Sequence, residues 1–270
     1  MPLEALLFWT TLFIYVVVFC CNSIGFVYQK KKLEDIAVKL LWLGLIFHTA
    51  TGIVRWTAGN HPPVTDTYEL NLTGTWFTIL LFILFVRIEK LDRAIGIIVV
   101  PVCFVIMGYG FLTGVEIKPM GPAFQSPWLI VHVIFAWLAF GSYAIASGSS
   151  VFFLLKKKKS QWNPMAKIAD AASLDISSYR YVILGFINHA VMLVSGAIWA
   201  KKLWGTYWSW DPLETWSLIS FLFYAFYLHA RSFLGWKMEK AAWLCISGLV
   251  ILAISFWGVG LFGPTIHPGP

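Results

Sequence analysis

The stretch that decides the fold is PWLIVHVIFAWLAFGSYAIASGSSVFFLLKKKK, residues 127–159. Its first part, residues 127–155, contains no Asp, Glu, Lys or Arg, and four lysines follow it directly. This uncharged apolar run is longer than the roughly 20 residues that a helix needs to cross a bilayer. The run therefore predicts a transmembrane helix, and the lysines predict that its C-terminal end faces the cytoplasm.

The rest of the chain has the same character. Of its 270 residues, 59% are hydrophobic, 17% aromatic and only 12% charged, and the mean hydropathy is +0.75. This composition lies outside the range of soluble globular domains. We therefore expect an all-α polytopic membrane protein with about eight transmembrane helices, forming one membrane domain over residues 1–270. The expected spans lie near residues 5–28, 38–57, 71–88, 94–113, 127–155, 181–200, 212–231 and 241–262.

Basic residues follow every second span, which predicts the orientation of the chain. They are Lys30, Lys31, Lys32, Lys39, Arg87, Lys90, Arg93, Lys156 to Lys159, Lys167, Arg180, Arg231, Lys237 and Lys240. By the positive-inside rule these loops face the cytoplasm, so both termini and the loop 201–216 face the external (periplasmic) side. The net charge of +7 is explained by this topology. The expected partners therefore include membrane lipids, and the charge gives no reason to expect nucleic acid as a partner. The first apolar run lacks a basic region before it and a cleavage pattern after it, so we expect a retained span.

Aromatic residues and acids are concentrated in WGTYWSWDPLETW, residues 204–216. Tryptophan and tyrosine collect at membrane interfaces, so the loop is interpretable as an anchor belt. The density of rings above Gly205 also favours a platform for a planar, largely apolar ligand. Asp211, Pro212 and Glu214 have the pattern of a helix start, with an N-cap, a first-turn proline and a capping acid. Both interpretations of the rings remain open at this point.

Two histidines are expected on the same side of the membrane as this loop. His132 lies ~8–9 Å into its span from the outer end, by the rise per residue of a helix, and His267 follows the last span. A bis-histidine heme site requires two neutral imidazoles on opposite sides of the iron, with aromatic residues over the macrocycle. The alternative is that both are polar surface residues.

Three further histidines are expected at membrane depth. His229 lies ~26 Å from the outer end of its span, where it is either an interfacial histidine near Arg231 or a ligand at an intramembrane site. His48 and His189 can complete such a site or hydrogen-bond across helices, and we favour the hydrogen bond. His61 receives no role. The four cysteines fall within spans, and we expect them to pack or to face lipid.

The residues 204–216 resemble the tryptophan-rich "WWD" signature of heme-handling membrane proteins, and specifically of the CcsA (ResC) family of system II cytochrome c biogenesis. The resemblance extends to SGAIWAKKLWG before the signature, to FYLHAR after it, and to RWTAGNHPPVTDTYE between the second and third spans. In that family the signature binds heme on the external side and two histidines in flanking loops are its axial ligands. The matching positions are His132 and His267.

The resemblance also implies the remaining site residues and partners. His229 matches a histidine of an intramembrane heme site, and the cofactor is heme b, handled as a substrate. The implied heme-binding residues are Trp204, Gly205, Trp208, Trp210, Asp211, Glu214 and Arg55, together with the three histidines. Arg55, Lys201 and Lys202 are the external cations available to the heme propionates, and Arg55 is the first candidate. The implied membrane is the bacterial inner membrane or a thylakoid-type equivalent.

The resemblance implies that the chain is the synthase (heme lyase) component of a complex with a CcsB (ResB) partner. Such a complex presents reduced heme for thioether attachment to the CXXCH cysteines of apocytochrome c, and the chemistry is largely that of the cofactor. Two alternatives within heme chemistry are a carrier that hands heme to a chaperone and a cytochrome b-like electron carrier. A transporter that uses the aromatic loop only as an anchor is a third alternative. The family pattern differs here at Leu213 and after His267.

Overall fold

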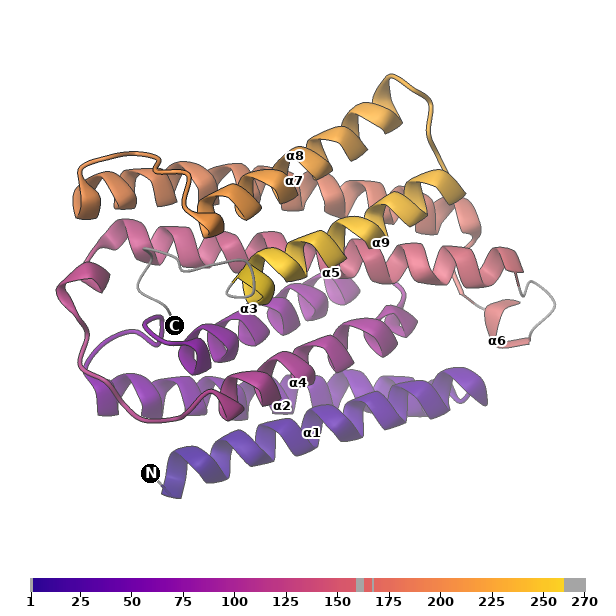
Figure 1. Ribbon diagram of the computed structural model, residues 1–270. Helices are drawn as coiled ribbons and strands as arrows, with labels where there is room; N and C mark the ends of the chain where they lie inside the picture. The colour runs from indigo at the N-terminus through magenta and orange to yellow at the C-terminus, as the bar shows by residue number, and fades with distance from the viewer. Residues whose placement is uncertain (1, 159–162, 167, 260–270) are drawn as a thin grey trace. The chain divides into compact units, whose positions relative to one another are not determined.

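The computed structural model describes residues 2–158, 163–166 and 168–259, and every regular element in these residues is a helix (Figure 1). The helices in chain order are α1 (Pro2–Val27), α2 (Lys31–Gly59), α3 (Thr67–Ile88), η1 (Arg93–Ile95), α4 (Gly96–Leu112), η2 (Pro122–Phe124), α5 (Pro127–Lys158), α6 (Asn163–Ala166), α7 (Ala171–Trp204), α8 (Pro212–Ser232), α9 (Glu239–Ala253) and η3 (Ile254–Gly258). The prediction of an all-α membrane protein is confirmed.

Each predicted span overlaps a helix, and the last, 241–262, overlaps α9 and η3 and ends outside the described residues. Seven of these helices are long and apolar enough to cross a membrane, and α8 is not among them. Helix α8 has 21 residues, a length that suffices for a bilayer, but polar side chains interrupt its apolar surface. The helix boundaries follow from local chemistry. Asp66 and Asp170 cap the first turns of α3 and α7 through their side chains, as N-cap acids do.

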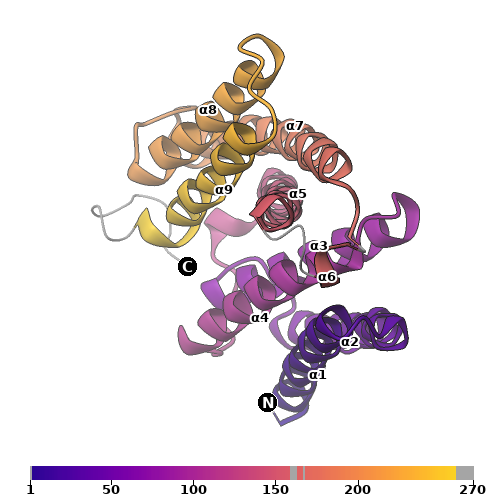
Figure 2. The same cartoon turned by 90° about the vertical axis from the view of Figure 1, so that its right-hand side faces the viewer.

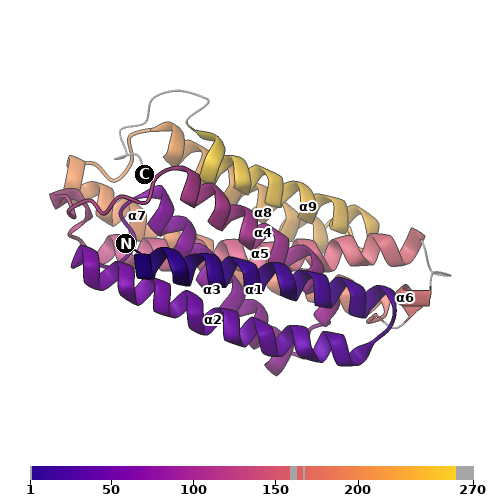
Figure 3. The same ribbon diagram turned by 90° about the horizontal axis from the view of Figure 1, so that it is seen from below.

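Packing divides the described chain into two compact units. Unit 1 comprises residues 1–120 and 159–169, and unit 2 comprises residues 121–158 and 170–269. In unit 1, α1 packs along α2 and α3 packs along α4 (Figure 3). Close approach of α1 and α2 depends on Gly44, because a Cβ there would lie 2.6 Å from the Tyr15 ring.

The C-terminal end of α2 and the N-terminal end of α3 in unit 1 meet at a buried arginine. Arg55 is 1% exposed. It donates from Nε to Glu69 at 2.8 Å and from Nη2 to Asp66 at 3.1 Å. Its other bonds go to the carbonyl oxygens of Val115 at 2.7 Å and Glu116 at 2.9 Å. Burial raises the pKa of the Asp66 carboxyl, and the Arg55 charge acts in the opposite direction. Arg55 therefore ties two helix ends to the loop after α4.

In unit 2, α5 is the central helix (Figure 2). It packs most extensively against α7 and also against α9. Every residue from 139 to 150 is buried, and most of them are Ala, Gly or Ser. Small side chains let helices approach closely in membrane proteins. Glycines on the facing helices have the same effect, since a Cβ at Gly185 would lie 2.7 Å from the Tyr143 ring.

The end of unit 2 opposite the tryptophan loop is held by a nearly buried ion pair. Arg231 donates to both carboxylate oxygens of Asp175, at 2.7 and 2.9 Å. The backbone N–H of Met238 donates to the same carboxylate at 3.0 Å. This bidentate arrangement connects the end of α8 and the start of α9 to α7, and its fork geometry is the one that favours arginine over lysine.

Candidate functional site

The tryptophan loop lies between two helix ends that its own sequence determines. Helix α7 ends at Trp204, and Gly205 adopts a left-handed conformation with φ of 77°, which a glycine adopts without strain. Helix α8 begins at Pro212, with Asp211 as N-cap accepting from the Leu213 N–H at 2.9 Å. The loop is therefore a short connection between a terminating glycine and a capped helix start.

Glu214 completes a capping box and also holds the loop in place. Its Oε2 accepts from the Asp211 N–H at 3.3 Å and from the backbone N–H of Ser209 at 2.8 Å. The Ser209 hydroxyl donates to the same oxygen at 3.1 Å. The prediction that the two acids begin the helix is confirmed, and both carboxylates are buried in this role.

The rings of the loop differ in how far they are exposed. Trp210 is 70% exposed and has φ of 61°, a conformation that a bulky side chain rarely adopts. Its ring meets that of Trp208 edge-on, with centroids 5.8 Å apart. The Trp208 Nε1 is buried and has no hydrogen-bond partner among the described residues. A strained backbone at Trp210 thus accompanies a buried indole N–H at Trp208 for which the described residues provide no acceptor.

A cleft in unit 2 joins this loop to α5 and α7. Its lining residues are His132, Leu193, Gly196, Ala197, Trp199, Tyr207, Trp208, Leu213, Glu214 and Ser217. The cleft therefore brings together His132, Trp208 and Glu214, which the sequence had marked separately. Trp204 lies next to it, with its ring centroid 5.9 Å from that of Trp199.

The position of His132 is fixed by α7. Its Nδ1 lies 2.9 Å from the carbonyl oxygen of Met192. A carbonyl oxygen only accepts, so Nδ1 carries the proton and Nε2 carries the lone pair. Gly196 makes this approach possible, because a Cβ there would lie 2.6 Å from Nδ1. The neutral imidazole is therefore held in the tautomer that carries its proton on Nδ1.

Trp199 and Gly196 belong to the cleft but were not among the predicted site residues. The Trp199 indole donates to the Ala123 carbonyl oxygen at 2.9 Å, and its ring centroid lies 6.2 Å from that of His132. Both residues lie in the SGAIWA segment that precedes the tryptophan loop. Their spacing of three residues on a helix places them on one face, and this was the available sequence signal.

Two further histidines, His229 and His267, were predicted to bind iron. His267 lies outside the described residues. His229 is exposed on α8, where its ring stacks on Phe233 with centroids 5.0 Å apart. Fifteen residues separate it from Glu214 in the cleft, or ~22 Å along the helix. The His229 side chain is exposed and so points away from the core of unit 2. A second ligand for an iron bound to His229 would therefore have to come from outside that core.

The remaining histidines and Arg55 have partners in unit 1, except His189. Both ring nitrogens of His48 are engaged, with the Tyr15 hydroxyl at 3.1 Å and the Leu72 carbonyl oxygen at 2.9 Å, which confirms the preferred hydrogen-bond interpretation for His48. His61 bonds two backbone carbonyl oxygens. His189 is buried in unit 2, and neither ring nitrogen has a hydrogen-bond partner among the described residues. Arg55 makes the four bonds given above, so a propionate would have to replace one of them.

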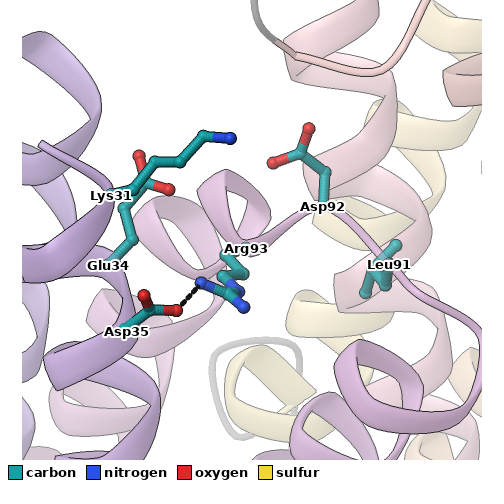
Figure 4. A pocket seen from close by; sticks show the side chains of 6 residues that line it. All are labelled: Lys31, Glu34, Asp35, Leu91, Asp92 and Arg93. Carbon is teal, nitrogen blue, oxygen red and sulfur yellow. Dashed lines mark hydrogen bonds and ion pairs between the residues drawn. The ribbon is translucent and has the colours of Figure 1, made fainter. Parts of the chain in front are cut away.

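Unit 1 has a cleft of a different kind, shown in Figure 4. It is open and lined by Lys31, Glu34, Asp35, Leu91, Asp92 and Arg93. Arg93 pairs with Asp35, while Asp92 accepts from the backbone N–H groups of Ala94 and Ala169, both at 3.0 Å. The Asp92 carboxylate thus holds the start of η1 and Ala169, which follows α6. Of the six residues that line this cleft, five are charged and the sixth is Leu91.

Comparison with known proteins points to one family. Residues 64–267 match the family described as "Cytochrome C assembly protein". The chain is 32% identical to "Cytochrome c biogenesis protein CcsA" of Chlamydomonas reinhardtii over 87% of its length and 69% of the relative's. It is 31% identical to the protein of that name from Prochlorococcus marinus (strain AS9601), over 91% of its length and 87% of the relative's.

A solved structure with a similar fold is that of "Cytochrome c Heme Lyase CcmF". The match has a TM-score of 0.67 at 16% identity and covers 97% of this chain and 49% of that one. This chain therefore spans about half the length of that protein, and the likeness concerns the fold. The family match covers more than half of the chain and the relatives exceed 30% identity, so this integral membrane protein of cytochrome c biogenesis belongs to the cytochrome c assembly family, among the CcsA proteins.

Proposed function

We propose that this chain binds heme b in the cleft of unit 2 and presents it for attachment to apocytochrome c. The observation that carries the proposal is the tautomer of His132, whose Nδ1 donates to the Met192 carbonyl oxygen at 2.9 Å. We propose that the other ring nitrogen, Nε2, binds the iron, in the way that backbone carbonyls orient metal-binding histidines. His267 is the proposed second axial ligand, on the basis of the family resemblance.

The residues that line the cleft support the proposal of heme binding in two further respects. Its walls include Trp199, Tyr207 and Trp208, and flat aromatic rings suit a macrocycle that stacks on them. The buried Trp208 Nε1 lacks an acceptor within the described chain, and a propionate carboxylate would supply one. Lys201 and Lys202, both exposed at the end of α7, are the proposed cations for the propionates in place of the fully engaged Arg55.

Asp211 and Glu214 support the site through the backbone. Both cap α8, and Glu214 also holds Ser209, which fixes the loop that carries Trp208 and Trp210. Thioether formation adds a cysteine thiol across a heme vinyl group, and this needs position more than acid–base groups on the synthase. The chain's contribution is thus to fix the plane of the heme and to hold one axial position.

We also propose that His229 is a ligand at an intramembrane site completed by a CcsB (ResB)-like partner. The side chain is exposed on α8, and ionisable groups in membrane spans usually mark a functional pathway. Large apolar side chains exposed on the same helix are Ile219, Leu222 and Phe226. A partner helix that covers this face would bring a second ligand to His229. The proposed membrane is the bacterial inner membrane or its thylakoid equivalent, with the cleft on the external side.

The alternatives differ in what they require of the histidines. A cytochrome b-like carrier needs histidines with ligating nitrogens inside the helices, and His48 has both nitrogens in hydrogen bonds. A carrier that passes heme to a chaperone requires the same cleft, and it differs from a synthase only in the absence of thioether formation. Incubation of the purified complex with a reduced CXXCH peptide separates these two, because only a synthase yields the covalent product.

The test of heme binding uses His132→Ala in the complex purified with its partner. We expect this variant to lose heme from the external site and to lose cytochrome c maturation. Added imidazole should restore part of both, because a small ligand can occupy the vacated axial position. Full maturation by His132→Ala without imidazole would contradict the proposal.

A further inference from the structure

The side of α8 that is buried in unit 2 is unusually polar. Its buried residues are Glu214, Ser217, Ser220, Tyr224, Tyr227 and Ala230. The spacing of three and four residues places them on one helix face. In a membrane protein every buried polar group needs an internal partner, because lipid supplies none. Each polar side chain on this face of α8 therefore needs a hydrogen-bond partner inside the protein.

The two serines are satisfied within the helix, but the tyrosines are not. Ser217 and Ser220 donate to the carbonyl oxygens of Glu214 and Ser217, at 2.7 and 2.9 Å. The hydroxyls of Tyr224 and Tyr227 are buried and have no hydrogen-bond partner among the described residues. Ser178 on α7 is a polar neighbour of Tyr227.

Two more side chains with buried, unmatched polar atoms adjoin these tyrosines. The ring of Tyr143 on α5 stacks on that of Tyr224, with centroids 3.5 Å apart and planes within 5°. The ring of His189 on α7 lies 6.1 Å from that of Tyr143. Within the described chain, the Tyr143 hydroxyl and both His189 nitrogens lack hydrogen-bond partners. We call Tyr143, His189, Tyr224 and Tyr227 the tyrosine–histidine cluster.

Packing fixes the two stacked rings of the cluster in place. A Cβ at Gly185 would lie 2.7 Å from the Tyr143 ring, and one at Gly248 would lie 2.8 Å from that of Tyr224. Each ring is therefore pressed against a helix backbone and has little room to turn its hydroxyl toward another group. A phenylalanine would fill the same space, so packing alone does not account for the hydroxyls. Buried polar groups in native proteins nearly always have a hydrogen-bond partner, which can be a bound water molecule.

We propose that the tyrosine–histidine cluster binds water molecules in the core of unit 2 and forms an internal proton-exchanging network. A buried water needs two to four polar partners, and three hydroxyls and an imidazole around one core supply them. On α5, Ser147 and Ser150 follow Tyr143 at successive turns and are also buried. Ser150 bonds Ser178 at 2.8 Å, which extends the polar interior toward Tyr227. A hydroxyl or imidazole in contact with water can both donate and accept protons.

The network reaches the cleft through α7 and α8. On α7, His189 precedes by one turn Met192, whose carbonyl oxygen accepts from His132. On α8, Ser217 lines the cleft, and its backbone also lies near His189. These positions place the cluster next to the cleft along α7 and α8. The inference does not depend on heme, since it rests on the polar atoms of the cluster alone.

Hydroxyl-radical footprinting of the full chain in nanodiscs, in ¹⁸O-labelled water, tests the proposal. Radicals that form on bound water label the adjacent side chains, even where bulk solvent does not reach. We expect Tyr143, Tyr224 and Tyr227 to be oxidised several-fold faster than Tyr15, with ¹⁸O incorporated. Tyr15 is the matched control, because it is fully buried and its hydroxyl is already bonded to His48. Labelling of the three tyrosines no faster than Tyr15 would overturn the proposal.

Thermal unfolding of Tyr224→Phe gives a second, independent result. If the hydroxyl binds water, its removal breaks a hydrogen bond, and the unfolding midpoint should fall by about 2–4 °C. If the core is dry, removal of an unmatched hydroxyl should raise the midpoint, which would contradict the proposal. Tyr15→Phe calibrates the loss of one buried hydrogen bond, because its partner is known. Tyr143→Phe should behave as Tyr224→Phe does.

Discussion

Replacement of Gly196 by alanine should displace His132 while leaving the imidazole itself intact. The added Cβ would lie 2.6 Å from His132 Nδ1 and 2.9 Å from its Cε1. Ordinary contact begins at about 3.4 Å, so the ring or the α7 backbone must move by about 0.8 Å. The bond from Nδ1 to the Met192 carbonyl oxygen is 2.9 Å long, and a movement of this size would break or bend it.

The expected free-energy change has three parts. Overpacking costs roughly 1–3 kcal/mol, and loss of the His132 hydrogen bond costs roughly 0.5–1.5 kcal/mol. Alanine offsets about 1 kcal/mol of this through its better helix propensity. Gly108→Ala is the matched control, because Gly108 is also helical and a Cβ there would meet nothing within 4 Å. The difference between the two variants isolates the steric part, which should be roughly 1.5–4.5 kcal/mol.

The assay measures thermal stability and heme content of the complex purified with its partner. Gly196→Ala should lower both, and added imidazole should raise its heme content, because the axial position has lost its ligand. Gly108→Ala should match the wild type in heme content. If Gly196→Ala keeps full heme content and stability, then α7 does not position His132, and the reasoning from its tautomer is wrong.

Substitutions at Asp211, Arg55 and His229 test other parts of the structure. Asp211→Asn should change stability and heme content very little, because Asn is as good an N-cap as Asp. Asp211→Ala should cost ~0.5–2 kcal/mol of stability. Loss of heme from Asp211→Asn at a normal protein level would show that Asp211 has a direct role in heme binding. Arg55→Met leaves buried carboxylates without a counter-charge and should cost ~3–5 kcal/mol of stability. Arg93→Met, at an exposed pair, should cost less than ~1 kcal/mol, and equal losses for the two would refute the structural role of Arg55. His229→Ala should deplete heme at both sites, whereas His132→Ala should leave an inner heme in place; normal external heme in His229→Ala would remove this chain's two-site route.

The sequence predicted the helices because their signal is local. Uncharged runs set the spans, and Gly205, Asp211 and Glu214 set the ends of α7 and α8 through capping chemistry that depends on neighbours in the chain. The division into two units was not predictable in this way, because hydropathy specifies which segments cross a membrane and not which of them pack together.

The site was predictable only in part, for a related reason. His132, Trp208 and Glu214 were selected by residue type, and the structure brings them to one cleft. The hydrogen-bond partners that orient these side chains include backbone atoms, such as the carbonyl oxygen of Met192. Every residue has such atoms, so a pattern of residue types does not predict which of them is the partner. Arg55 shows the converse case. Its charge made it a candidate for propionates, but Asp66 and Glu69, eleven and fourteen residues later, fold back to engage it.

The most direct test of the central claim, that His132 Nε2 binds heme iron, is the spectrum of a ligand exchange. His132→Met keeps a side chain able to ligate iron but changes its donor atom from nitrogen to sulfur. The oxidised and reduced spectra of the purified complex, with its partner present, should therefore change from those of bis-histidine heme to those of histidine–methionine heme. Spectra identical to the wild type at full heme content would contradict the claim.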